Sequence, residues 1–211
     1  MRYLYIDTSS SYLYAAIVED TKEISCISEE FGQTLSEIAL PRIAEMFEKN
    51  NLSTKSVDKI IVVNGPGSFT GIRIGITIAK IYAWSLNIPI TTITSLDAMA
   101  CSCTSKRTKI PMLNARRGYV YTAIYDENNN ILFNPCHIKL SEFKKEMFKY
   151  NDYIIISNDE FEEEFEKIGY VPDYVTIISK FKDKDNINPH AINPDYLKLT
   201  EAEESKLWFM N

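Results

Sequence analysis

Short apolar runs bounded by polar or turn-forming residues recur along the chain, and longer segments with an apolar stripe lie between them. Runs of about four to eight apolar residues are typical of buried strands, whereas apolar positions about three and four residues apart indicate amphipathic helices. The alternation of the two patterns favours an α/β fold. It predicts strands over 4–6, 12–18, 22–31, 59–63, 88–93, 110–114, 119–125, 131–138, 153–156 and 174–178, and helices over 34–49, 72–87, 98–103, 141–150 and 159–168.

Two of the predicted helices have unusual features. The helix over 34–49 contains Pro41, which is expected to kink it or to mark its first turn. The helix over 72–87 is apolar nearly all round, and Gly71, Gly75, Ala79 and Ala83 form a stripe of small residues along it. A helix that covers one side of a sheet needs only one apolar face. This helix is therefore either central to the core or in contact with another subunit through the small-residue stripe, and we favour the second reading.

A pattern repeats between the two halves of the chain. The segment Tyr12–Ile17 resembles Tyr119–Ile124, and at the same offset Asp7 corresponds to Asn114. Either two hairpins are alike by chance, or the fold is duplicated with a cleft between its halves. A duplicated fold of this kind resembles the actin, hexokinase and Hsp70 superfamily, which implies two lobes (1–105 and a reduced 106–211) of mixed sheets flanked by helices. That resemblance implies acidic turns that hold nucleotide phosphates and magnesium, and Asn114 weakens such a site because an amide binds a hard cation less well than a carboxylate.

A glycine-rich loop joins the predicted strand over 59–63 to the helix that follows it. Glycines permit positive φ and close backbone approach, and amides at a helix start can bind an anion. The loop lacks the Gly-Lys-Ser/Thr of a P-loop. It is either a tight turn without a ligand or an anion or nucleotide site formed by Asp7, Gly65, Gly67, Ser68, Thr70 and Gly71.

Composition narrows the choice of partners. The 211 residues carry a net charge of −6, with a pI of about 5.1, which disfavours autonomous binding to nucleic acid. Arg116 and Arg117 are the best candidate for a local basic patch, and we expect them to make salt bridges rather than phosphate contacts. No signal peptide or membrane span is evident, so a cytoplasmic protein with reduced thiols is expected. The chain has no Cys-x-x-Cys pair and only two distant histidines, so no metal site is expected.

Several segments together resemble the bacterial TsaB (YeaZ) family of threonylcarbamoyladenosine tRNA-modification proteins. The most specific is Gly65-Pro66-Gly67-Ser68-Phe69-Thr70-Gly71-Ile72-Arg73-Ile74-Gly75. Weaker matches follow in order along the chain: Ile6-Asp7-Thr8-Ser9, Leu35 to Phe47, Asn114 to Tyr121 and Pro194 to Lys198. The chain departs from the family pattern at Asn114, where the family usually has Asp, and at Tyr119, where it usually has Glu.

The resemblance implies a non-catalytic scaffold and activator that pairs with a TsaD-type catalytic subunit, which modifies adenosine 37 of tRNAs reading ANN codons. A TsaE-type ATPase would join the pair, tRNA would be reached through the complex, and ATP with magnesium would sit at the shared interface rather than in a cofactor site of the chain's own. A homodimer is expected to be possible when the chain is alone. The alternative is a small kinase or ATPase that uses Asp7. The expected partner interface consists of Leu35, Ile38, Ile43, Met46, Gly71, Gly75, Thr77, Ile78, Ala79 and Tyr82.

Overall fold

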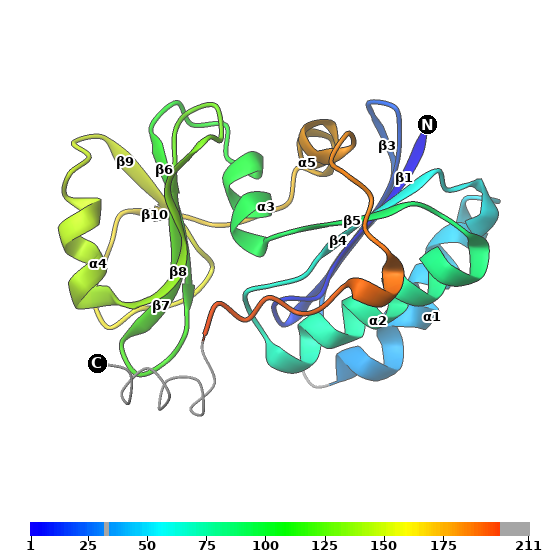
Figure 1. The fold of residues 1–211 in the computed structure, drawn as a ribbon, viewed down its shortest axis with the longest axis horizontal. Helices are drawn as coiled ribbons and strands as arrows, with labels where there is room; N and C mark the ends of the chain where they lie inside the picture. Colours follow the sequence, from blue (N-terminus) through cyan, green and yellow to red (C-terminus); the bar gives the residue numbers. More distant parts are fainter. Residues whose placement is uncertain (32–33, 199–211) are drawn as a thin grey trace.

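Two five-stranded mixed sheets form the framework of the computed structural model, which describes residues 1–31 and 34–198 (Figure 1). In the first sheet the strand order is β3-β2-β1-β4-β5, and in the second it is β8-β7-β6-β9-β10. The first comprises β1 (Arg2–Asp7), β2 (Tyr12–Glu19), β3 (Lys22–Glu30), β4 (Lys59–Val63) and β5 (Ile90–Ile93). The second comprises β6 (Thr108–Asn114), β7 (Tyr119–Tyr125), β8 (Ile131–Lys139), β9 (Tyr153–Ile156) and β10 (Lys167–Ile168).

The helices and sheets alternate as five layers. Helices α1 and α2 pack side by side on one face of the first sheet, while α3 and α5 pack between the two sheets, and α4 covers the outer face of the second sheet. Each helix buries one face in an apolar cluster, which is the main source of stability for such layers. The helices are α1 (Leu35–Lys49), α2 (Phe69–Leu86), α3 (Ser95–Ser102), α4 (Leu140–Met147) and α5 (Tyr174–Phe181), with short 3-10 turns at Thr54–Ser56 and Pro189–Ala191.

The duplication predicted from the sequence is confirmed. In the first sheet β1 pairs antiparallel with β2 and parallel with β4, and in the second β6 pairs antiparallel with β7 and parallel with β9. Asp7 ends β1 and Asn114 ends β6, so the two residues occupy equivalent places. The two-lobed α/β fold class is therefore correct, and chance resemblance of two hairpins is not needed to explain the repeat.

Two predicted elements are wrong. Residues 159–168 form no helix. The rings of Phe161 and Phe165 lie edge to face with each other and pack against the core of the second sheet, and Lys167–Ile168 pair with β9. Residues 174–178, expected as a strand, begin α5 instead. Asp173 caps that helix, since its Oδ1 accepts a hydrogen bond from Thr176 N–H at 3.0 Å, and such a cap outweighs the strand preference of a β-branched run.

The chain returns to the first sheet after β10. The Tyr174 hydroxyl donates to the Ile27 carbonyl at 3.0 Å, and farther along Ile187 N–H donates to the Ile90 carbonyl at 2.8 Å. The expected boundary at 105/106 separates the two sheets, but α5 and the segment after it belong by packing to the first. Pro41 lies in the interior of α1, which begins at Leu35, so it does not mark the first turn of that helix.

Candidate docking face and interlobe cleft

The glycine loop fastens the start of α2 to the turn between β1 and β2. Gly67 has φ of +149°, and a Cβ there would lie 2.2 Å from the Ser9 carbonyl oxygen, so a larger residue does not fit. Ser68 N–H donates to that same carbonyl at 2.7 Å, and the Ser68 hydroxyl accepts from Gly71 N–H at 3.2 Å. These amides are used within the loop, so an anion would meet the remaining first-turn amides of Phe69 and Thr70.

Asp7 is engaged by its own turn. It is 2% exposed, its Oδ1 accepts from Ser9 N–H at 2.8 Å, and its Oδ2 lies 3.4 Å from the Tyr5 hydroxyl. Burial raises the pKa of the Asp7 carboxyl above its ordinary value, and the hydrogen bonds from Ser9 and Tyr5 offset part of that increase.

This raised pKa predicts how stability depends on pH. The native state holds the Asp7 proton more tightly than the unfolded chain, so the contribution of Asp7 is greatest below its unfolded pKa and declines as pH rises through the folded pKa. The variant Asp7→Asn, which keeps an acceptor for Ser9, is therefore expected to unfold at higher urea concentration than wild type at neutral pH. The difference should shrink towards about pH 4; a variant less stable than wild type at neutral pH would contradict the assignment.

A cleft of about 1380 Å³ opens between the lobes, where Asp7 and Asn114 both line it. The Asn114 amide nitrogen donates to the Glu160 carbonyl at 2.7 Å, and its Oδ1 accepts from Arg116 N–H at 2.8 Å. Asn114, which stands where the duplicated fold would have its second acidic residue, therefore stabilises its own loop. The expected loop residues Gly67, Ser68, Thr70 and Gly71 also line the cleft, with Tyr14, Tyr121 and Tyr170 around it.

The small-residue stripe of α2 faces inward. Ala79 is fully buried, and a Cβ on Gly75 would lie 2.3 Å from Thr8 Oγ1. Small residues are needed there because the helix approaches β1 and the turn after it closely. The expectation that this stripe meets another subunit is therefore wrong, and its residues belong to the chain's own core.

The other expected interface residues divide between the core and the surface. Leu35, Ile43, Met46 and Gly71 are buried within the first lobe, together with Gly75 and Ala79, so they cannot form an outer face as expected. Ile78 is only 7% exposed, but it lines a groove between α1 and α2. Ile38 and Tyr82 are partly exposed, and Thr77 is exposed.

A second apolar stripe lies on the outer side of α2. Phe69 is 56% exposed, Ile81 53% and Trp84 68%, and exposed Arg73 and Thr77 lie between them at helical spacing. A groove of about 440 Å³ runs between α1 and this stripe. We name this surface the α1–α2 face; its residues are Ser36, Leu40, Phe69, Thr70, Arg73, Ile74, Thr77, Ile78, Ile81 and Trp84. The helix has two apolar sides as expected, but sequence reasoning missed Phe69, Ile81 and Trp84, whose spacing marks the outer stripe. It also missed Leu40, which lines the groove from α1.

One end of the α1–α2 face is ordered by an aromatic stack. The rings of Phe69 and Tyr196 stack with centroids 5.1 Å apart, and the Arg73 guanidinium lies 3.8 Å from the Phe69 centroid. Arg73 Nε donates to the Tyr196 hydroxyl at 2.7 Å. The segment from Pro194 to Lys198 thereby borders the groove.

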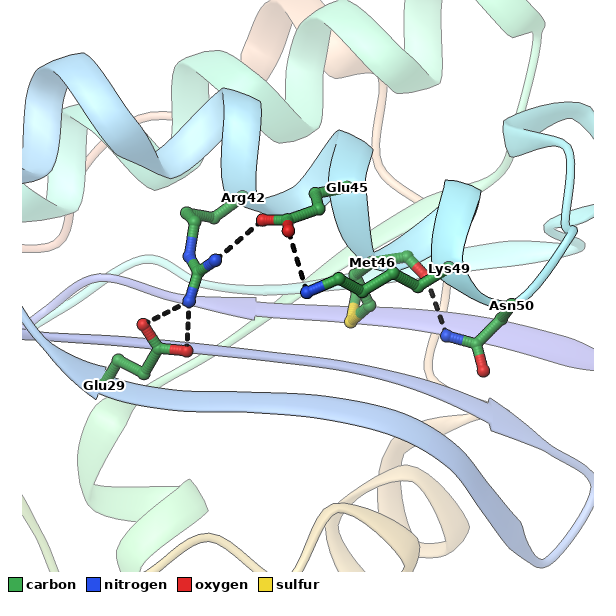
Figure 2. A network of polar contacts seen from close by, with 6 residues as sticks. All are labelled: Glu29, Arg42, Glu45, Met46, Lys49 and Asn50. Atoms are coloured by element: carbon green, nitrogen blue, oxygen red, sulfur yellow. Dashed lines mark hydrogen bonds and ion pairs between the residues drawn. The ribbon is translucent and has the colours of Figure 1, made fainter.

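Helix α1 is held in place by polar contacts to β3 (Figure 2). Both carboxylate oxygens of Glu29 accept from the Arg42 guanidinium at 2.5 Å, and the same guanidinium pairs with Glu45, which also binds Lys49. The hydrogen bonds that the Arg42 guanidinium donates to Glu29 and Glu45 raise the pKa of Arg42. Asn50 Nδ2 donates to the Met46 carbonyl at 2.8 Å and closes the helix end. The network fixes the orientation of one wall of the groove.

The described residues form neither a metal cluster nor a membrane-spanning helix. Among them, no group of three or more His, Cys, Asp or Glu side chains is arranged to hold a metal ion. None of the helices described has both the length and the apolar character to cross a bilayer.

Comparison with known proteins gives consistent matches. The sequence model of the family described as "TsaD: tRNA N6-adenosine threonylcarbamoyltransferase" matches residues 26–174. The "tRNA threonylcarbamoyladenosine biosynthesis protein TsaB" of Bacillus subtilis is 31% identical over 96% of this chain and 96% of its own. The protein of the same name from Escherichia coli is 30% identical over 62% of this chain and 57% of its own. The solved structure of YeaZ from Pseudomonas aeruginosa superposes with a TM-score of 0.76 at 16% identity, over 93% of this chain and 99% of that one.

Proposed function

The chain belongs to the TsaB family of tRNA threonylcarbamoyladenosine biosynthesis proteins, and we propose that it is the non-catalytic scaffold and activator subunit of that pathway. In this proposal it pairs with a TsaD-type catalytic subunit, and the complex modifies adenosine 37 of tRNAs that read ANN codons. A TsaE-type ATPase joins the pair, and tRNA is modified by the complex as a whole.

The exposed α1–α2 face is the observation that carries the proposal. Three large apolar side chains of one helix, Phe69, Ile81 and Trp84, are each more than half exposed beside a groove. Contiguous apolar surface of this kind is uncommon on monomeric proteins and marks interaction sites. Pairing of this face with helices of the sister subunit would remove it from water, and in the absence of that subunit a second copy of the chain would serve the same purpose.

The residues of the interlobe cleft support a role in which the chain itself catalyses no reaction. The Asp7 carboxyl accepts hydrogen bonds from its own turn, and the equivalent Asn114 offers an amide that braces its loop. A phosphotransfer site of the duplicated fold would use an acidic turn from each lobe, and an amide in place of one carboxylate binds magnesium more weakly. We therefore place ATP and magnesium at the shared subunit interface, next to the start of α2, where the sister subunit would supply the missing ligands.

Reconstitution with purified components tests the proposal. The chain would be mixed with a TsaD-type subunit, a TsaE-type ATPase, ATP, the threonylcarbamoyl donor and an ANN-reading tRNA. Modified adenosine, measured by nucleoside analysis, is expected only when the chain and the catalytic subunit are both present, and size exclusion with light scattering should show their complex. Steady ATP turnover by the chain alone, lost in Asp7→Ala, would instead support the kinase or ATPase alternative.

A further inference from the structure

We propose that the exposed ends of β7 and β8, together with the turn before β7, form a binding site for single-stranded RNA. The inference rests on the proposed function, since the RNA it fits is an unpaired loop of the tRNA that the complex modifies. We name this surface the β7–β8 platform; its residues are Arg116, Arg117, Tyr119, Tyr121, His137 and Lys139.

Three rings of the platform lie in contact with one another on one face of the sheet. The register pairs Tyr121 with His137 and Tyr119 with Lys139, so the four side chains share a face. The rings of Tyr119 and His137 lie 4.7 Å apart with an interplanar angle of 9°, and Tyr121 lies 5.1 Å from His137. Both tyrosines are only partly buried. Such a row of partly exposed rings can stack an unpaired base, which duplex RNA does not offer.

The turn before β7 places two arginines beside these rings in a conformation that their side chains disfavour. Arg116, Arg117 and Gly118 have φ of 66°, 52° and 74°, and Tyr119 N–H donates to the Arg116 carbonyl at 3.0 Å. Tight hairpin turns with positive φ favour Asn and Gly, because a Cβ is crowded there. Arginine at two such positions brings local strain, and strained residues in an overdetermined turn cluster at functional sites.

The charges of the platform are available to a ligand. Among the residues that the structure describes, the guanidinium groups of Arg116 and Arg117 and the ammonium of Lys139 have no carboxylate partner. The expectation that the two arginines form salt bridges is therefore wrong for this part of the chain. The nearby Asp159 carboxylate instead accepts from Asn114 N–H at 2.7 Å.

The β7–β8 platform lies next to the interlobe cleft, so a bound RNA strand could extend beyond the platform. Arg116 and Tyr121 line the interlobe cleft, and the Lys139 ammonium lies 5.8 Å from the centre of the Tyr119 ring. Cations next to a stacking surface match a strand whose phosphates flank an exposed base. The net charge of −6 argues against a large electrostatic footprint, so the contact is local and adds to binding by the complex.

Fluorescence anisotropy with the full-length chain tests this site. A short labelled single-stranded RNA is expected to bind at low salt with a Kd of about 10 to 100 μM, and more tightly than the same RNA annealed to its complement. The double variant R116Q/R117Q should weaken binding about tenfold and reduce the salt slope by about 1 to 1.5, because two phosphate contacts are lost. Y119A should also weaken it about tenfold, and Y119F should restore binding to within about twofold of wild type.

A matched control removes the same charge elsewhere. K55Q/K106Q changes two exposed lysines outside the platform and should leave binding within about twofold of wild type. Equal losses in the control and in R116Q/R117Q, equal affinity for duplex and single strand, or no saturable binding by the wild type would each overturn the inference. All variants should still pair with the catalytic subunit in size exclusion; if pairing fails for the wild type too, it is the proposed function that fails.

Discussion

The variant Ile81→Glu is expected to lose pairing with the TsaD-type subunit while the chain keeps its fold. Ile81 is 53% exposed in the outer stripe of α2 and lines the groove against α1. A carboxylate buried there by a partner would lose its hydration without gaining a cation, so we expect a Kd at least about 100-fold weaker, the effect of a hot-spot substitution. Isothermal titration with the catalytic subunit measures the change directly.

A second apolar-to-acidic substitution separates docking from general surface effects. Ile131 on β8 is 51% exposed, close to the value for Ile81, and lies in the other lobe. Ile131→Glu should therefore pair like wild type, and both variants should keep the wild-type thermal midpoint because neither side chain is in the core. Undiminished pairing of Ile81→Glu would show that the α1–α2 face is not the interface.

Sequence reasoning assigned the small-residue side of α2 to a partner, and the structure shows that this side lies in the chain's own core. Periodicity shows that Gly71, Gly75 and Ala79 share one side of α2, but it does not show what covers that side. Thr8, more than 60 positions away in the sequence, fills it, through a hydrogen bond from its hydroxyl to the Gly71 carbonyl. Small residues allow close approach by any neighbour, and here the neighbour is the chain's own β1–β2 turn.

Local patterns predicted the repeated lobes better than the segments between and after them. The hairpins at Asp7 and Asn114 were predictable because each combines strand periodicity with a turn. Tyr174–Phe181 was misread because its apolar run suits a buried strand as well as a buried helix. Asp173 is the residue that indicates a helix, because it caps the helix start. The long-range hydrogen bond from Tyr174 to Ile27 then holds the helix against the first sheet.

The contact between Gly71 and the β1–β2 turn leads to the second large effect, which concerns stability rather than binding. A Cβ on Gly71 would lie 2.0 Å from the Thr8 backbone oxygen, and Thr8 is only 1% exposed. Neither group can move without displacing α2 or the turn. Gly71→Ala should therefore destabilise the chain by about 3 kcal/mol, the upper part of the usual range for overpacking, even though alanine is the better helix former. Urea unfolding followed by circular dichroism measures the difference.

Gly169→Ala is the matched control, because its added Cβ would meet only the Asn158 side-chain oxygen, at 3.2 Å. A loss below about 1 kcal/mol is expected there, since one side chain can adjust where a backbone cannot. The two large effects then separate cleanly: Gly71→Ala acts on folding and Ile81→Glu on association. If Gly71→Ala were as stable as wild type but failed to pair, the small-residue side of α2 would be open to a partner after all, and the outer stripe would lose its assignment as the docking face.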